Sequence, residues 1–427
     1  MSRKPSKLIT AAVAAVACLL APVVVAGPSQ AVPDIGRDPA VISEWNAIAV
    51  RTIATENGTP VPASPLYFAF VSIAMHDAVA TIEGGFEPFT ELPRAHAHAS
   101  PEVAAATAAH HVLKHYFPNS GANLDADYAA FLAEVPKGVG LVHGTRVGED
   151  AAAAIIALRA DDGRGDPHPF LAQPDIGVWR PTPDLLLPMA VSWLGFVDPL
   201  VIDSPTQFAP AGPDPVESDA YATDFTEVKE KGALNGSTRS DDESATALFW
   251  TANPVAQYNA VMRAETAQRG YDIGESARAF ALLGTSMADT QITCWRSKFD
   301  EAYWRPITAI HEAGADGNDA TMADPMWKAF RETPPYPDYT SGHACVTGSA
   351  SEVFGHLFGA DTIDIDVPST VQGRPDRHFA ATSDLDDEAM NARIWLGFHF
   401  RKAMTDGNAL GHSVAGHVID SAFVSTD

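Results

Sequence analysis

The chain has 427 residues and carries 54 aspartates and glutamates against 28 lysines and arginines, for a formal net charge of −26. So acidic a chain repels nucleic acids, anionic membranes and polyphosphates at long range, which makes them poor partners. Its length suits one large or two modest domains, and no internal repeat is present.

The N-terminus is typical of an export signal. Three cations precede an apolar run at 8–26, and small residues follow at 29–31. We expect cleavage near Ala31, with Ala26 as the alternative site, and a secreted mature protein. The run is long enough to span a bilayer, so a retained anchor is the competing interpretation. Cleavage leaves 25 cations against 54 carboxylates, and we expect no membrane association afterwards.

The first predicted region, residues 32–210, opens with alanine-rich stretches in helical spacing. We expect helices at 41–55, 65–82, 101–116, 123–135 and 139–160, each bounded by Gly, Pro or Asn. His76 and Asp77, and the pair His110 and His111, resemble metal ligands in type. On such helices we expect them to be packing residues with local hydrogen bonds instead.

Residues 161–215 are rich in proline and lack a helical period. Trp179, Trp193 and Phe196 argue against a flexible linker, because flexible linkers are polar and lack large apolar side chains. We expect a long ordered loop of the kind that often walls a pocket.

The second predicted region, residues 211–427, returns to helical spacing. We expect helices at 215–232, 241–251, 255–269, 273–295, 299–313, 344–359, 385–401 and 404–424. The best strand signal, at 362–367, is short. The expected fold is therefore an all-α helical bundle with long ordered loops.

Three stretches of this region combine cations and imidazoles. In the first, Lys298 and Arg305 are seven residues apart, which on one helix means two turns along one face and about 10 Å. Pro306 disfavours the helical conformation for Arg305, so we expect the helix to end there, with the guanidinium free to turn inward. Both cations can then face one pocket.

The second stretch, residues 334–343, is a proline-rich loop that leads into an apolar run of small residues. Thr340 or Ser341 suits the N-cap of the expected helix, with Gly342 and His343 following. The free amides and positive dipole end of such a helix start favour an anion.

The third stretch places Arg393 and His399 six residues apart. Arginine offers a planar fork of donors, and neutral histidine a lone pair that can attack or coordinate phosphorus or a phosphorus-like metal. In an ideal helix the two side chains point about 120° apart, so they converge only if the arginine curls round or the helix opens near Gly397. A buried histidine beside an arginine paired with a carboxylate is the competing interpretation.

The order Lys-x6-Arg-Pro, Ser-Gly-His and Arg-x5-His resembles the three-part signature of the vanadium haloperoxidase and type 2 phosphatidic acid phosphatase superfamily. The order of segments from Trp45 onward is also similar to the secreted actinobacterial members of the haloperoxidase branch. The resemblance implies the helical bundle of that superfamily, with orthovanadate as the cofactor.

The resemblance further implies a role for each motif residue. His399 would bond vanadium or attack phosphorus, His343 would be the acid-base, and Lys298 would polarise the peroxide. Trp295 and Tyr336 stand where fungal-type chloroperoxidases place aromatic residues near the halide. The residues that bind the oxygens of vanadate or phosphate would be Lys298, Arg305, Ser341, Gly342, Arg393 and His399.

The sequence departs from the family at Ala403. The chloroperoxidases have an aspartate at this position, four residues after the catalytic histidine, that hydrogen-bonds the ring. An imidazole ligand usually needs such a partner to fix its tautomer, so we expect another group to bond His399. Asp406 is close in sequence. Thr340 stands where a proline is commoner, a change that the cap geometry tolerates.

Three functions are compatible with these motifs. The favoured one is oxidation of a halide by hydrogen peroxide at a histidine-anchored vanadate, with halogenation of an organic substrate. The alternative is a secreted acid phosphatase that cleaves a phosphoester through a phosphohistidine intermediate. The third is an exported oxyanion-binding protein without turnover. The sequence has no Gly-rich phosphate loop, Ser elbow or Cys-His zinc spacing.

Two cysteines lie beside the motifs: Cys294 precedes Lys298 by four residues, and Cys345 follows His343 by two. Export favours oxidation, and the motifs are expected to meet in space. Two alternatives therefore stay open, a disulfide between the cysteines or a pair of buried thiols.

Overall fold

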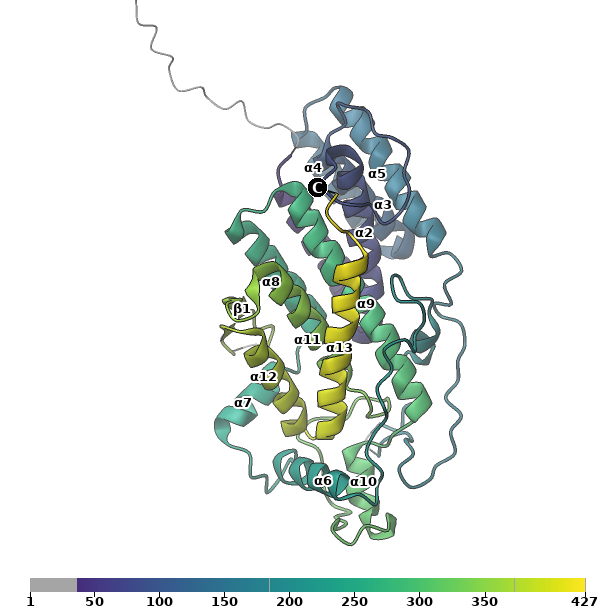
Figure 1. The fold of residues 1–427 in the computed structure, drawn as a ribbon, viewed down its shortest axis with the longest axis vertical. Helices are drawn as coiled ribbons and strands as arrows, with labels where there is room; N and C mark the ends of the chain where they lie inside the picture. The colour runs from purple at the N-terminus through teal and green to yellow at the C-terminus, as the bar shows by residue number, and fades with distance from the viewer. Residues whose placement is uncertain (1–36, 184, 372, 427) are drawn as a thin grey trace, which may run out of the picture. The chain divides into compact units, whose positions relative to one another are not determined.

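Helices account for most of the structure, a computed structural model that describes residues 37–183, 185–371 and 373–426 (Figure 1). The expected export signal at 1–31 lies outside these residues. Contacts join Gly36–Asp427 into one compact unit. Helices from both predicted regions share one core there, because α2 packs against α9. The all-α expectation is confirmed.

The five helices expected in the first region lie within a few residues of their predicted bounds. The π-turn η1 (Arg51–Glu56) extends the first of them, and the 3-10 turns η2 (Val61–Ala63) and η3 (Pro118–Ser120) precede the second and fourth. The helices are α1 (Ala40–Val50), α2 (Ser64–Glu83), α3 (Pro101–Tyr116), α4 (Gly121–Glu134) and α5 (Val139–Leu158).

The histidines on these helices have structural partners. His76 Nε2 lies 3.1 Å from the backbone oxygen of Glu87, and Asp77 accepts backbone amides from the loop after α2. His110 Nε2 lies 2.9 Å from Asp125 Oδ1. Each side chain thus makes the kind of local contact expected of a packing residue.

The second region contains the remaining helices and one small antiparallel sheet, in which β1 (Ile365–Val367) pairs with β2 (Arg377–Phe379). The strand signal at 362–367 is confirmed in its second half, whereas β2 was not expected. The helices are α6 (Asp219–Lys231), α7 (Asp241–Phe249), α8 (Pro254–Arg269), α9 (Ile273–Glu301), α10 (Pro306–Glu312), α11 (Gly342–Phe354), α12 (Thr382–Trp395) and α13 (Arg401–Ser421), with the short turns η5 (Ala313–Ala315) and η6 (Gly355–Gly359). The 3-10 turn η4 (Ser192–Phe196) lies in the first region, in the long loop before α6.

The 29-residue helix α9 is the central element of the core. Asp272 and Glu275 form a capping box at its start, which satisfies two orphan donors reciprocally. The helix packs on α2, α11 and α13 (Figure 1). Small residues let α11 and α13 approach: a Cβ on Gly348 would lie 2.3 Å from the Asn408 oxygen, and one on Gly411 would lie 2.2 Å from the Cys345 oxygen.

The segment between α5 and α6 is a long ordered loop, as predicted. Trp179 is buried in the core. The buried Asp289 of α9 accepts the backbone amides of Leu200, Val201 and Ile202 at 2.7, 2.7 and 3.1 Å. A carboxylate that accepts three amides fixes the loop against the central helix.

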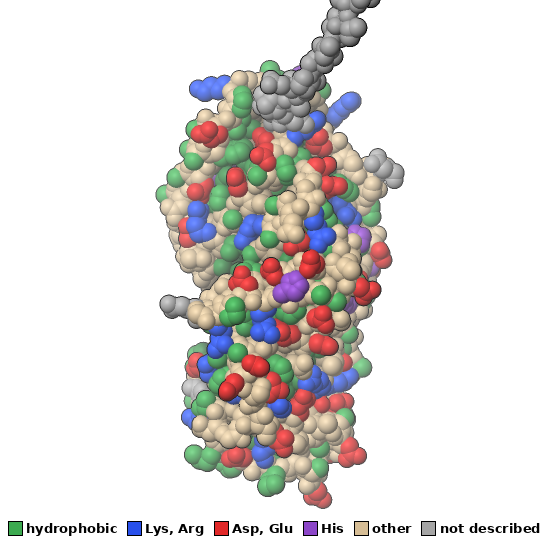
Figure 2. All heavy atoms as spheres, turned by 90° about the vertical axis from the view of Figure 1, so that its left-hand side faces the viewer, with side chains coloured by type: hydrophobic (Ala, Val, Ile, Leu, Met, Phe, Trp, Pro, Cys, Tyr) green, Lys and Arg blue, Asp and Glu red, His purple; other side chains and the backbone are tan. Residues whose placement is uncertain are grey.

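The acidic side chains do not gather into one patch on the visible face. Figure 2 shows them scattered among cationic side chains. Among the described residues, the stretch Val61–Glu83 is long and apolar enough to cross a membrane by length and composition. However, 83% of its most apolar window is buried inside the protein, as in a core helix.

Candidate active site

The first motif is split between two helices. Lys298 lies in the last turn of α9, and Ala302, with φ of 50°, ends that helix. Arg305 is the extended N-cap residue of α10. The expectation of one helical face carrying Lys298 and Arg305 is therefore wrong, as is the break expected between 295 and 299. The Ala302 oxygen instead accepts the amide of Trp179 in the long loop, which stabilises the turn.

Both cations face the proline-rich loop despite this break. Lys298 and Arg305 are fully buried. Lys298 Nζ donates to the backbone oxygens of Pro337 and Asp338 at 2.8 and 3.1 Å. Arg305 Nε donates to the backbone oxygen of Tyr336 at 2.7 Å. The loop thus gathers both side chains at one place, as the sequence predicted.

His399 lies on a turn and not in a helix. The helix expected at 385–401 ends at Trp395, and Gly397 adopts φ of 80°. A Cβ on Gly397 would lie 2.6 Å from the Gly232 oxygen and 3.0 Å from Ala329 Cα, so a glycine is required. The helix opens near Gly397, which is one of the two conditions stated for Arg393 and His399 to converge.

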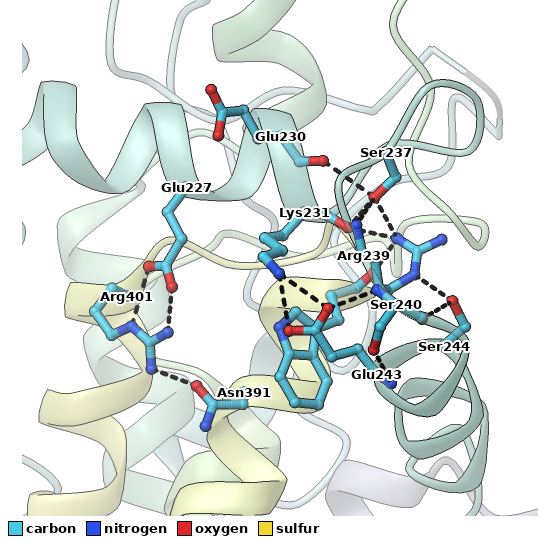
Figure 3. Close-up of polar contacts among 11 residues, drawn as sticks. Glu227, Glu230, Lys231, Ser237, Arg239, Ser240, Glu243, Ser244, Asn391 and Arg401 are labelled. Carbon is cyan, nitrogen blue, oxygen red and sulfur yellow. Dashed lines mark hydrogen bonds and ion pairs between the residues drawn. The ribbon is translucent and has the colours of Figure 1, made fainter.

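A polar network holds this turn from both sides (Figure 3). Arg401, at the start of α13, forms an ion pair with Glu227 of α6 and donates to Asn391 of α12 at 2.8 Å. Arg239 donates to the backbone oxygen of Trp395 at 2.9 Å. Side chains from α6, the segment after it, α12 and α13 therefore hold the His399 turn.

The partner of His399 is Asp338. His399 Nδ1 lies 2.9 Å from Asp338 Oδ1, and both residues are buried. The expectation that a group other than residue 403 bonds the second ring nitrogen is confirmed. Asp406 does not take this role, because its carboxylate accepts from Tyr339 and pairs with Lys402.

Arg305 contacts the same imidazole. Its Nη1 lies 3.1 Å from His399 Nε2 and 3.3 Å from Nδ1, and it donates to the Phe398 oxygen at 2.7 Å. Since Asp338 accepts at Nδ1, the tautomer that satisfies both contacts carries its proton on Nδ1 and leaves the Nε2 lone pair toward Arg305.

Arg393 and His343 lie at the other side of the site. Arg393 is 3% exposed, and its Nη1 donates to the Trp250 oxygen at 2.8 Å. His343, in the first turn of α11, is partly exposed. Its Nε2 and the Arg393 Nε have no hydrogen-bond partner among the described residues. Both atoms are therefore free to bind a ligand.

Ser341 and Gly342 begin α11, as predicted. Ser341 Oγ accepts from the Ala344 amide at 3.5 Å, which is the expected cap. Trp295 lies so close that a Cβ on Gly342 would approach its ring to 2.8 Å. Trp295 and Tyr336 pack with centroids 5.1 Å apart, and Lys298 Nζ lies 5.5 and 5.0 Å from their respective centroids.

A cavity of about 410 Å³ opens beside these residues. Part of its wall comes from the start of α8 and the turn before it, the η2 turn and the loop at 331–334, and Gln291, Val346 and Phe398 also line it. Lys298, Arg305, Ser341 and His399 do not line it and are buried. The predicted residues that line it are Trp295, Tyr336, Gly342, His343 and Arg393.

Several groups of like charge are buried together in the site, and their burial shifts their pKa values. Burial lowers the pKa of Lys298 to about 8 and that of Arg393 to about 10. Burial, with the charges of Arg305, Lys298 and Arg393, holds the pKa of His399 well below its ordinary value, so the ring is neutral. Burial raises the pKa of Asp338 to about 7, against the opposing charges of Arg305 and Lys298.

This set of side chains fits a tetrahedral oxyanion such as vanadate or phosphate. Lys298, Arg305 and Arg393 supply three positive charges, and Asp338 is the carboxylate bonded to His399. Buried donors without partners are rare in proteins and call for an explanation. An anion would satisfy the free Arg393 Nε and offset the excess positive charge.

The two cysteines near the motifs are buried free thiols. Of the two alternatives left open by the sequence, the structure therefore contains the thiol pair and not the disulfide.

Part of the chain is similar in sequence to known proteins. Residues 278–425 match the family described as the VCPO second helical-bundle domain, and this stretch contains all the predicted site residues. A vanadium chloroperoxidase of Curvularia inaequalis is 26% identical over 231 residues, which are 40% of this chain and 37% of that protein. The chain thus matches little more than a third of the curated relative.

The solved structures show the same fold. A bacterial vanadium-dependent iodoperoxidase matches with a TM-score of 0.80 and 24% identity, over 92% of this chain and 99% of that one. An apo-type bacterial vanadium-dependent chloroperoxidase matches with a TM-score of 0.70 and 16% identity, over 87% and 96%. The fold is that of the vanadium haloperoxidases. The resemblance stated from the motifs is confirmed by the matching family model, by the curated relative and by the shared fold.

Sequence reasoning missed the role of Asp338. The residue stands three positions before Ser341 in the proline-rich loop, but a partner 61 residues from His399 has no signature in spacing. The available signal was indirect. Because Ala403 cannot bond the His399 ring, another group must do so, and a carboxylate within a motif loop is a candidate for that partner.

Proposed function

We propose that the chain is a vanadate-dependent haloperoxidase that oxidises a halide with hydrogen peroxide. The observation that supports this most directly is the neutral, buried His399, held at Nδ1 by Asp338 and surrounded by three buried cations. The names of its relatives, a chloroperoxidase and an iodoperoxidase, favour this use of the site over phosphoester hydrolysis.

Each residue has a definite task in this proposal. His399 would hold vanadate through Nε2, and the bound vanadate would supply a Lewis acid that activates peroxide. Lys298 supplies a positive charge that stabilises the negative charge developing on the reacting peroxide. His343, at the cavity wall, acts as the general acid-base. Trp295 and Tyr336 form the aromatic side of the halide pocket. Lys298, Arg305, Ser341, Gly342 and Arg393 would bind the vanadate oxygens.

The deciding experiment is a halogenation assay on metal-stripped protein. A dione is offered with peroxide and iodide, bromide or chloride, across a titration of orthovanadate. We expect halogenation that needs vanadate and that phosphate inhibits in competition with vanadate. Halogenation without vanadate, or phosphate that fails to compete, would count against the proposal.

Variants assign the roles in the same assay. His399→Ala should abolish the vanadate-dependent rate, and Lys298→Ala should lower the rate more steeply than the vanadate affinity, because its charge acts in the transition state as well. Lys137→Ala, at an exposed lysine far from the motifs in sequence, is the matched control and should behave like wild type. Phosphoester hydrolysis inhibited by vanadate, with no halogenation, would instead establish the phosphatase alternative.

We further propose that the protein is secreted after cleavage near Ala31. N-terminal sequencing of protein recovered from the culture medium tests this. A mature chain that begins near residue 32 is expected, and an intact N-terminus in the membrane fraction would support the retained anchor.

A further inference from the structure

Cys294 and Cys345 bring two thiols together beside the cation cluster. Cys294 lies on α9 one turn before Lys298, and Cys345 lies in the first turns of α11. Each thiol shifts the pKa of the other. Thr340 Oγ1 lies 3.3 Å from Cys294 Sγ and 3.4 Å from Cys345 Sγ. Both sulfurs thus lie within 3.4 Å of one hydroxyl oxygen, where α9 meets α11.

The surroundings make the two thiols unequal. Burial raises the pKa of Cys294, but the hydrogen bond with Cys345 and the charge of Lys298 outweigh burial, so this pKa is lowered overall. Burial raises the pKa of Cys345 well above its ordinary value. The thiolate is the nucleophile in thiol oxidation. Cys294 lies one turn before the Lys298 charge and accepts from Thr340 Oγ1 at 3.3 Å, so we expect it to be the sulfur that attacks.

Burial also restricts what these thiols can react with. Both cysteines and Thr340 are fully buried, so a disulfide with a second protein molecule is sterically blocked. The described residues contain no other cysteine, and Cys18 lies outside them. The partner within reach of each sulfur is therefore the other one, and the oxidant must be small.

We propose that Cys294 and Cys345 are an oxidisable dithiol site, which hydrogen peroxide converts into a disulfide between α9 and α11. The Cys294 thiolate attacks one peroxide oxygen, and the O–O bond breaks to give a sulfenic acid and, with one proton, water. Cys345 sulfur then attacks Cys294 sulfur, and the released hydroxide takes the Cys345 proton. Two thiols and one peroxide thus give one disulfide and two waters.

The new bond would connect the helix that carries Lys298 to the helix that begins at Ser341. It closes a loop of about 50 residues, which restricts the unfolded chain and stabilises the folded one. We therefore expect the oxidised protein to melt at a higher temperature than the reduced protein. This step needs neither vanadate nor halide.

The test uses the full chain with Cys18→Ser, free of vanadate, so that its outcome is independent of halogenation. In denaturant, two thiols should titrate before peroxide treatment and none afterwards. Peptide mapping should find the peptides of Cys294 and Cys345 joined, with two hydrogens lost, and dithiothreitol should restore both thiols. Cys345→Ser is the matched control, which cannot form the bond and should show no rise in melting temperature with peroxide.

Two results would overturn the proposal. One is a Cys18→Ser protein that still titrates two thiols after peroxide exposure. The other is loss of both thiols as sulfinic or sulfonic acids on separate peptides. If Cys345→Ser does not fold, thiol titration and peptide mapping of the Cys18→Ser chain still test the proposal.

Discussion

At the residue scale, Asp338 sets the state of His399. Its Oδ1 accepts from Nδ1 at 2.9 Å, which directs the lone pair of Nε2 toward the cations. A ligand histidine generally depends on such a partner for its tautomer and orientation. The carboxylate is itself held by the charges of Arg305 and Lys298, without which burial would raise its pKa further.

Removing this partner should weaken the site. We expect Asp338→Ala to lower vanadate affinity by about 10- to 100-fold, the usual effect of losing such a contact. Asp406→Ala is the matched control, because Asp406 is closer to His399 in sequence but bonds Tyr339 and Lys402. Calorimetric titration with vanadate measures both. Equal affinities in the two variants would show that Asp338 does not position His399.

Lys298 should make the affinity for an oxyanion depend on pH. Because burial lowers its pKa to about 8, the side chain is charged below that pH and becomes neutral above it. Oxyanion affinity should therefore fall by up to about tenfold per pH unit above pH 8. Lys298→Arg keeps its charge at all these pH values. The ratio of wild-type to variant affinity cancels the ionisation of the ligand, and a ratio that stays constant with pH would contradict the assignment.

The sequence predicted most of these residues because motif chemistry is local. Lys298, Arg305, Arg393 and His399 belong to short stretches whose side chains suit an oxyanion whatever path the chain takes. Asp338 could not be assigned in the same way, since its contact with His399 depends on how a proline-rich loop packs against a distant turn.

At the element scale, the turn after α12 determines where His399 lies. Its left-handed Gly397 packs against the Gly232 oxygen at the end of α6. The helical period of 385–401 predicted one continuous helix, because periodicity does not report a tertiary contact of this kind. The same limit explains the missed break at Ala302, an alanine in a conformation that side chains rarely adopt.

Gly397→Ala tests the turn. We expect a loss of about 3 kcal/mol in the free energy of unfolding, from backbone strain plus the clash with Gly232, together with loss of vanadate binding. Gly236→Ala separates the two causes, because Gly236 has φ of 71° and no atom near its missing Cβ. That control should cost only about 1 kcal/mol. Equal losses in denaturant unfolding would mean that the Gly232 contact is unimportant.

At the scale of the whole molecule, the site joins segments that are far apart in the chain. The end of α9, the start of α11 and the turn before α13 all contribute side chains to it. A ligand that binds the folded state and not the unfolded chain shifts unfolding by mass action. Binding of vanadate at the site should therefore raise the free energy of unfolding of the whole core.

Vanadate at 100 times its dissociation constant should raise the free energy of unfolding by about 2.7 kcal/mol. Arg393→Ala should lose much of this gain, whereas Arg146→Ala, on an exposed face of α5, should keep it. Denaturant unfolding with and without vanadate measures the shift. No shift in wild type at a saturating concentration would show that the ligand does not bind the folded core.

The contact between Arg305 Nη1 and His399 Nε2, at 3.1 Å, has a kinetic consequence. A nitrogen lone pair serves one partner at a time, so an incoming ligand must exchange places with the guanidinium. Association should then proceed in two steps, and the observed rate should reach a plateau as vanadate concentration rises, at the rate with which Arg305 withdraws. Stopped-flow measurement would reveal this plateau, and a rate that rises linearly throughout would mean that the arginine yields without delay. Arg305 would then both bind the anion and limit the rate at which the anion enters the site.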